Sequence, residues 1–168
     1  MTSRVPRGFA AVEIDRVDWA AFRVLGGGAH EVPEALRRLV AARSEDEAWE
    51  AYWRLENAVV VQGALHSAAL PAVGVLLAAL LDELSADARD LVLELLRQIT
   101  AGEADGDEVA CGNGDLGPRC RDAARKGLWL LYRELGTRRR ETAEAILERV
   151  EDDPVRLAAY RERVRGRT

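Results

Sequence analysis

Apolar residues in this chain recur every three or four positions, which is the spacing of one face of an α-helix. In residues 91–99 this face is formed by Leu91, Val92, Leu95, Leu96 and Ile99, and residues 48–59 and 143–150 repeat the pattern. No segment alternates apolar and polar residues with a period of two. A period near 3.6 gives each helix one apolar stripe to bury. The pattern therefore predicts an all-α fold of antiparallel helix pairs, without a sheet.

Capping and breaking residues divide the chain into seven or eight expected helices. Ser44 followed by Glu47 is a capping box, and Ser85 is an N-cap residue. The glycines at 26–28 and the step at 62–63 indicate helix breaks. The helices are expected at 18–25, 33–42, 44–61, 65–84 with a kink near Pro71, 85–102, 115–135, 139–150 and from 153 onward. The residues expected in the core are Tyr52, Leu55, Leu76, Leu80, Leu91, Leu95, Ile99, Leu128, Leu131 and Ile146.

Short connections favour antiparallel neighbours, and one helix pair recurs about every 40 residues, as in HEAT-type repeats. We therefore expect a HEAT-like α-α superhelix. Residues 1–14 are expected to be a flexible N-terminal arm and residues 15–168 a single helical-repeat domain. The longest connection, residues 102–114, is expected to be a solvated loop, and the apolar run at 128–132 is expected to be buried on all sides.

Composition favours a soluble, globular protein, since 48% of the 168 residues are hydrophobic and 32% are charged. The first residues lack the apolar core of a signal peptide, and two cysteines are too few for a disulfide framework. The long uncharged stretch at 58–81 is interrupted by polar residues, glycine and proline, which favours a buried helix over a membrane span. A cytoplasmic protein without membrane contact is expected.

Charge is unevenly distributed along the chain. Residues 1–118 contain 10 basic and 20 acidic side chains, whereas residues 119–168 contain 14 basic and 9 acidic ones. An acidic surface favours fast capture of a basic partner. The candidate binding surface combines acids of the third expected helix with the polar residues near the break at 62–63: Glu45, Asp46, Glu50, Glu56, Asn57, Gln62 and His66. An alternative, basic surface consists of Arg121, Arg125 and Arg139.

Residue types that support catalysis or metal binding do not converge in the sequence. Cys111 and Cys120 form no CxxC pair, and the two histidines, His30 and His66, are far apart. The acidic stretch 103–108 lacks the register of a calcium-binding loop. We therefore predict no catalytic residue, no metal and no cofactor, and a non-enzymatic protein.

The stretch from Tyr52 to Val73, which reads YWRLENAVVVQGALHSAALPAV, resembles bacterial HEAT-like proteins. In those proteins a helix ends in a Gln-Gly step, and the next helix opens with an Ala-x-x-Pro-x-Val segment. Val17-Asp18-Trp19 with the downstream Val32-Pro33 is similar to the entry segment of that group, so the resemblance extends over residues 17–135. It implies a helical-repeat fold and, for some small members, an immunity or accessory role.

Three functions fit these observations. The first is a protein-binding helical-repeat module, in its narrower form an immunity or antitoxin-type protein whose acidic surface meets a basic partner. The second is a nucleic-acid-binding repeat protein that uses the basic C-terminal third, although the net negative charge disfavours it. The third is a small-ligand binder or enzyme with a pocket near Gln62 and His66.

Overall fold

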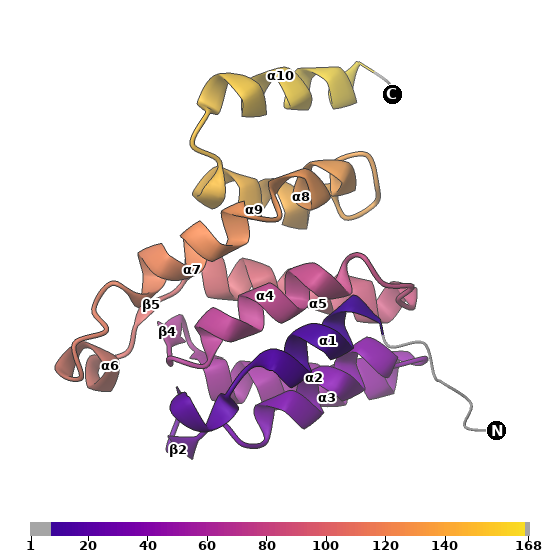
Figure 1. Cartoon of the computed structure of the whole chain (residues 1–168). Coiled ribbons are helices and arrows are strands. Elements are labelled where there is room, and N and C mark those ends of the chain that lie inside the picture. Colours follow the sequence, from indigo (N-terminus) through magenta and orange to yellow (C-terminus); the bar gives the residue numbers. More distant parts are fainter. Residues whose placement is uncertain (1–7, 167–168) are drawn as a thin grey trace.

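Successive helices pair along the chain in the computed structural model, which describes residues 8–166 (Figure 1). Helix α2 (Val32–Ala41) pairs with α3 (Glu45–Val59), and α4 (Ala69–Ala79) pairs with α5 (Ala86–Ala101). Next, α7 (Leu116–Arg125) and α8 (Leu128–Glu134) pack on α9 (Arg140–Val150). The described residues also contain α1 (Phe9–Arg16), α6 (Gly106–Ala110), α10 (Pro154–Arg165) and the 3-10 helix η1 (Trp19–Ala21). Residues 8–166 are therefore mostly helical, as predicted, and contain ten α-helices instead of seven or eight.

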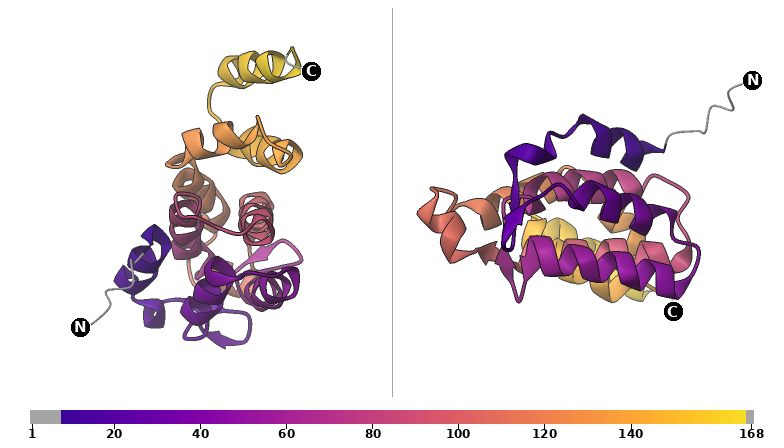
Figure 2. Two further views of the ribbon diagram at one scale, coloured as in Figure 1. Left: turned by 90° about the vertical axis from the view of Figure 1, so that its right-hand side faces the viewer. Right: turned by 90° about the horizontal axis from the view of Figure 1, so that it is seen from below.

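The helices lie in two layers. Helices α3, α5 and α9 pack in succession in one layer, and α1, α4 and α7 pack in succession in the other (Figure 2). Helix α10 lies at the end of the stack and buries Leu157. Helix α3 therefore lies at the opposite end of its layer from α9, with one side facing α5.

Every residue that the sequence placed in the core is buried, because the stripes at a period of 3.6 face the interface between the two layers. The most apolar helix, α4, is buried along much of its length. Within residues 8–166, no helix combines the length and the apolar character that crossing a bilayer requires. The prediction that the run 128–132 is buried on all sides was wrong, because Trp129 is 60% exposed.

Short strands overturn the prediction that the chain has no sheet. Strands β1 (Arg23–Val24) and β2 (Gly27–Gly28) form an antiparallel hairpin. Strands β3 (Val60–Val61) and β4 (Ala64–Leu65) form a second hairpin, to which β5 (Glu103–Ala104) adds in parallel. Each strand has two residues, too few to show an alternating pattern in the sequence.

The residues read as helix breaks are the turns of these hairpins. Gln62 and Gly63 have φ angles of 50° and 81°, the positive pair that a two-residue type I′ hairpin turn requires. Gly26 has a φ of 79° in the first hairpin. The expected helix 18–25 is therefore η1 followed by β1, and the expected helix 65–84 begins only at Ala69, which places Pro71 in the first turn of α4 and not at a kink.

The two hairpins belong to a repeating unit. From β1 to β3 the chain advances from residue 23 to 60, from β2 to β4 from 27 to 64, and from α2 to α4 from 32 to 69. Each step is 37 residues, close to the spacing of about 40 expected from the sequence. Both units contain a hairpin, then a histidine, and then a helix pair.

Other segments also differ from expectation. Helix α1 occupies part of the expected arm 1–14, because Asp82 accepts hydrogen bonds from the amides of Phe9 and Ala10 at its start; residues 1–7 lie outside the described residues. The expected helix 115–135 is divided at Gly127, where a Cβ would lie 2.4 Å from Leu77. The expected loop 102–114 contains β5 and α6.

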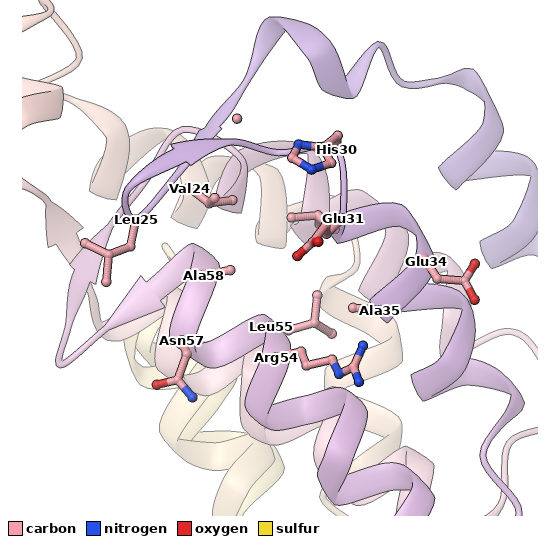
Figure 3. A pocket seen from close by; sticks show the side chains of 12 residues that line it. Val24, Leu25, His30, Glu31, Glu34, Ala35, Arg54, Leu55, Asn57 and Ala58 are labelled. Carbon is pink, nitrogen blue, oxygen red and sulfur yellow. The ribbon is translucent and has the colours of Figure 1, made fainter.

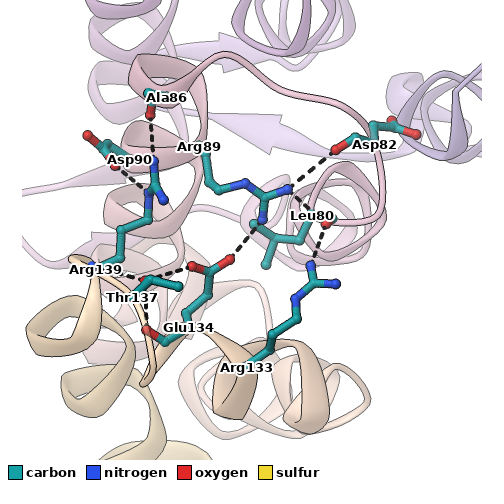
Figure 4. Close-up of polar contacts among 9 residues, drawn as sticks. All are labelled: Leu80, Asp82, Ala86, Arg89, Asp90, Arg133, Glu134, Thr137 and Arg139. Carbon is teal, nitrogen blue, oxygen red and sulfur yellow. Dashed lines mark hydrogen bonds and ion pairs between the residues drawn. The ribbon is translucent and has the colours of Figure 1, made fainter.

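A polar network joins the α4–α5 pair to α8 and α9 (Figure 4). The side chain of Glu134 is buried and accepts a 2.8 Å hydrogen bond from Arg89. Arg89 and Arg133 both donate to the carbonyl oxygen of Leu80. Arg89 and Arg133 thus meet at the end of α4, and Arg89 also bonds to Glu134 of α8. The network therefore fixes how consecutive helix pairs are stacked.

Candidate binding surface on helix α3

Helix α3 divides into a buried stripe and an exposed face. Ser44 caps it by accepting a hydrogen bond from the Glu47 amide, as the capping box predicted. Ala48, Leu55 and Val59 belong to its fully buried stripe. A helix of 15 residues has an outward side that this stripe cannot occupy. The residues on that side determine what α3 presents to solvent.

Two tryptophans one turn apart stand on the exposed side. The rings of Trp49 and Trp53 are stacked, with centroids 5.7 Å apart and an interplanar angle of 25°, and they are 38% and 51% exposed. Tyr52 supports both rings edge-on, at 5.4 Å from Trp49 and 5.6 Å from Trp53. Large exposed aromatic surface of this kind is typical of protein interaction sites, in which tryptophan is enriched.

Acidic side chains flank this pair. Glu45 and Asp46 lie exposed in the first turn of α3, where the helix dipole favours negative charge. Neither carboxylate forms a hydrogen bond or ion pair with another described residue, whereas Glu50 lies 3.0 Å from Arg54. The predicted acids thus share one helix with the stacked tryptophans. We call Glu45, Asp46, Trp49, Glu50 and Trp53 the α3 face.

Glu56 of α3 lies close enough to α5 for its carboxylate to feel the charge of Glu94. Its Oε2 atom is buried and has no hydrogen-bond partner among the described residues. Burial, and then the charge of Glu94, raise the pKa of Glu56. Glu94 is itself held by Arg97 at 2.6 Å and by Gln98. Burial and the same carboxylates raise the pKa of Tyr52, which keeps its hydroxyl neutral beneath the tryptophans.

A cavity of about 480 Å³ opens beside α3, between this helix, α2 and the hairpin of β1 and β2 (Figure 3). Its apolar lining includes Val24, Leu55 and Ala58, and its polar lining includes His30 and Glu31. The sequence identified none of these residues as part of a site. The missing signal was the hairpin, which brings residues 24–30 against α3.

The predicted polar set does not form one site. Asn57 lines the cavity and donates a 2.8 Å hydrogen bond to the carbonyl oxygen of Trp53. Gln62 is exposed in its hairpin turn, and His66 is 5% exposed, with a buried Nε2 that has no partner among the described residues. Glu56, Gln62 and His66 do not line the cavity that contains Asn57. Of these four polar residues, the cavity therefore includes Asn57.

The three arginines of the alternative basic surface bind carboxylates and backbone carbonyl groups of the chain itself. Arg121 donates to the carbonyl oxygens of Thr100 and Gly102 and pairs with Glu103 at 2.9 Å. Arg125 donates to the carbonyl oxygen of Val150 and pairs with two aspartates, Asp122 and Asp152. Arg139 pairs with Asp90. These contacts fasten helices to one another and leave the three guanidinium groups poorly placed to bind phosphates.

One buried carboxylate was missed because its segment was read as solvated. Glu108 is 1% exposed and accepts hydrogen bonds from Arg23 at 2.7 Å, the Ser67 amide at 2.9 Å and Asn113 at 2.7 Å. Burial alone would raise its pKa, but these donors lower it to about 2. Glu108 therefore joins α6 to both hairpin regions and has a structural role.

Grouped metal ligands are absent from the described residues, and one of the two free cysteines is buried. In residues 8–166, no three His, Cys, Asp or Glu side chains are grouped so as to hold a metal ion. Cys120 is buried, and burial raises the pKa of its thiol to about 12, which disfavours the reactive thiolate. No family model, curated protein or solved structure matches this chain.

Proposed function

We propose that this chain is a non-enzymatic, HEAT-like protein-binding module that captures a basic protein on its α3 face. The observation that carries the proposal is the stacked, exposed pair of Trp49 and Trp53, with the unpaired carboxylates of Glu45 and Asp46 on the same helix. Tryptophan side chains dominate the binding energy of many interfaces, and acidic neighbours select a partner of opposite charge.

The chemistry of the face favours lysine and arginine side chains from the partner. A guanidinium or ammonium group gains energy over the face of an indole ring as well as from a nearby carboxylate. The two tryptophans offer the first interaction, and Glu45 and Asp46 offer the second. The acidic excess in residues 1–118 extends the attraction beyond direct contact.

The narrower proposal is an immunity or antitoxin-type role in the cytoplasm, in which the basic partner is a toxin such as a nuclease. Its support is the acidic, aromatic face and the resemblance to small bacterial helical-repeat proteins. The nucleic-acid alternative is weaker, because the arginines that would carry it bind carboxylates and backbone carbonyl groups of the chain itself.

Affinity capture with a matched variant tests the proposal. The wild-type protein and the double variant Trp49→Ala/Trp53→Ala are immobilised and exposed to a lysate of the source cells with the nucleic acid digested. Retained proteins are identified by mass spectrometry, purified and titrated against both forms. We expect a protein with an excess of Lys and Arg that binds the wild type, is released by salt, and fails to bind the double variant.

The matched control is Trp129→Ala, which removes a tryptophan that is 60% exposed on α8. It should bind the partner as the wild type does. Equal binding of the purified partner to the wild type and to the α3 double variant would overturn the proposal. Tight binding of nucleic acid by the wild type, abolished by Arg121→Glu with Arg125→Glu, would favour the alternative.

A further inference from the structure

The cavity beside α3 combines apolar walls with one carboxylate that the fold leaves unused. Val24 and Ala58 contribute partly exposed apolar surface, and Glu31 lies at the start of α2. Figure 3 shows the Glu31 carboxylate directed into the space between α2 and α3. Within residues 8–166, this carboxylate has no ion-pair partner. A volume of about 480 Å³ lies in the range of sites that bind small groups.

The other charged groups around the cavity already have partners. Glu34 lies 3.2 Å from Arg38, and Arg54 lies 3.0 Å from Glu50. The cavity therefore presents a single uncommitted negative charge above an apolar floor. A group with a flexible apolar stem and a positive end fits that arrangement, because the stem buries methylenes while the cation reaches the carboxylate.

We infer that the cavity takes a lysine side chain of the basic partner, with its four methylenes against Val24 and Ala58 and its ammonium group at Glu31. The inference rests on the proposed function, and it extends the binding site from the α3 face across α3. Asn57 connects the two regions, since it lines the cavity and donates a hydrogen bond to the carbonyl oxygen of Trp53. Lysine fits Glu31 because its ammonium group is a compact point charge, which a single carboxylate can pair with.

Titration by nuclear magnetic resonance tests this inference without the partner. The probes are the peptide acetyl-Ala-Lys-Ala-amide, the same peptide with norleucine for lysine, and 1,5-diaminopentane. We expect the lysine peptide to shift the amide signals of Val24, Gly28 and Ala58 in a saturable way. The norleucine peptide, which keeps the stem and lacks the charge, should bind about tenfold more weakly, the loss of one charge-assisted contact.

Two variants separate the charge from the space. Glu31→Gln should weaken the lysine peptide about tenfold and leave the norleucine peptide unchanged. Ala58→Leu should weaken both peptides, because it fills the cavity. The matched control Glu83→Gln removes one exposed carboxylate in the α4–α5 connection and should change neither. Amide spectra of each variant establish that it is folded before titration.

Three results would overturn the inference: no saturable shift with the lysine peptide, equal binding of the two peptides, or tighter binding of 1,5-diaminopentane than of the lysine peptide. The last would assign the cavity to a free diamine. The two proposals fail separately. The variant Trp49→Ala/Trp53→Ala should still bind the lysine peptide but should no longer bind the partner. If the partner requires the two tryptophans and the cavity does not bind the lysine peptide, only the inference about the cavity is refuted.

Discussion

The guanidinium of Arg23 lies 2.7 Å from the buried carboxylate of Glu108, and this ion pair joins the first hairpin to helix α6, 85 residues later. Val24, the next residue, lines the cavity beside α3. The same Glu108 carboxylate accepts a hydrogen bond from the Ser67 amide, before α4. One buried carboxylate thus positions the hairpin that closes the cavity, and its loss should loosen that wall.

Acid should destabilise the protein through this group. The folded-state pKa of Glu108 is about 2, below its ordinary value of 4.5. The pKa of Glu151 is also lowered to about 2, because its carboxylate accepts hydrogen bonds from Arg156 and Tyr132. A depressed pKa contributes stability that is present above pH 4.5 and lost as pH falls toward about 2, because the unfolded chain binds protons first. We expect the free energy of unfolding in urea to fall over that window.

The variant Glu108→Gln supplies the control for the acid effect. It should lower the free energy of unfolding at neutral pH by about 1–3 kcal/mol, the cost of weakened bonds to buried donors. It should also reduce the slope of stability against pH between about 2 and 4.5. An unchanged slope would mean that other carboxylates cause the acid sensitivity.

Removal of Glu134 should strongly destabilise the stack. Glu134→Ala leaves Arg89, whose side chain is 17% exposed, without its carboxylate partner at 2.8 Å. An uncompensated buried charge costs about 3–5 kcal/mol. Asp122→Ala, which removes a 69% exposed partner of Arg125, should cost about 0–1 kcal/mol. Thermal and urea unfolding of both variants measures the difference, and equal losses would contradict the importance of burial.

Gln62 should tolerate glycine better than a β-branched residue. Its φ of 50° lies in the left-handed region, where β-branched side chains are strained. We expect Gln62→Val to lower the free energy of unfolding by about 1–2 kcal/mol. Gln62→Gly should leave stability unchanged or raise it slightly. If Gln62→Val left the free energy of unfolding unchanged, the claim that the turn strains a β-branched side chain at this position would be wrong.

The helices and their core could be predicted because each carries a repeated apolar stripe. The N-caps of α3 at Ser44, of α5 at Ser85 and of α10 at Asp153 are where the sequence placed them. The strands could not be predicted, because two residues show no periodicity. The glycines of the first hairpin and the step at 62–63 were recognised as breaks, but both a helix end and a hairpin turn use such residues.

The site was harder to predict than the fold because its parts come together only in space. The acids of α3 are visible in the sequence, and the apolar stripe of residues 48–59 includes Tyr52 but not Trp49 or Trp53. That the two exposed rings stack on one another is seen only in the structure. The cavity is formed in part by the hairpin of β1 and β2. Because the sequence did not predict that hairpin, it did not predict the cavity either. Arg121 and Arg125 formed a basic cluster in the sequence, whereas the structure uses both to hold neighbouring helices.

The affinity of the purified basic partner for the wild type and for Trp49→Ala/Trp53→Ala tests the central claim most directly. Two hot-spot tryptophans, each worth about 2 kcal/mol or more, predict a loss of at least about 700-fold for the double variant. Glu45→Lys with Asp46→Lys should slow association more than it speeds dissociation, and added salt should remove the difference. A double tryptophan variant that binds the partner as tightly as the wild type would contradict the claim that the α3 face is the binding surface.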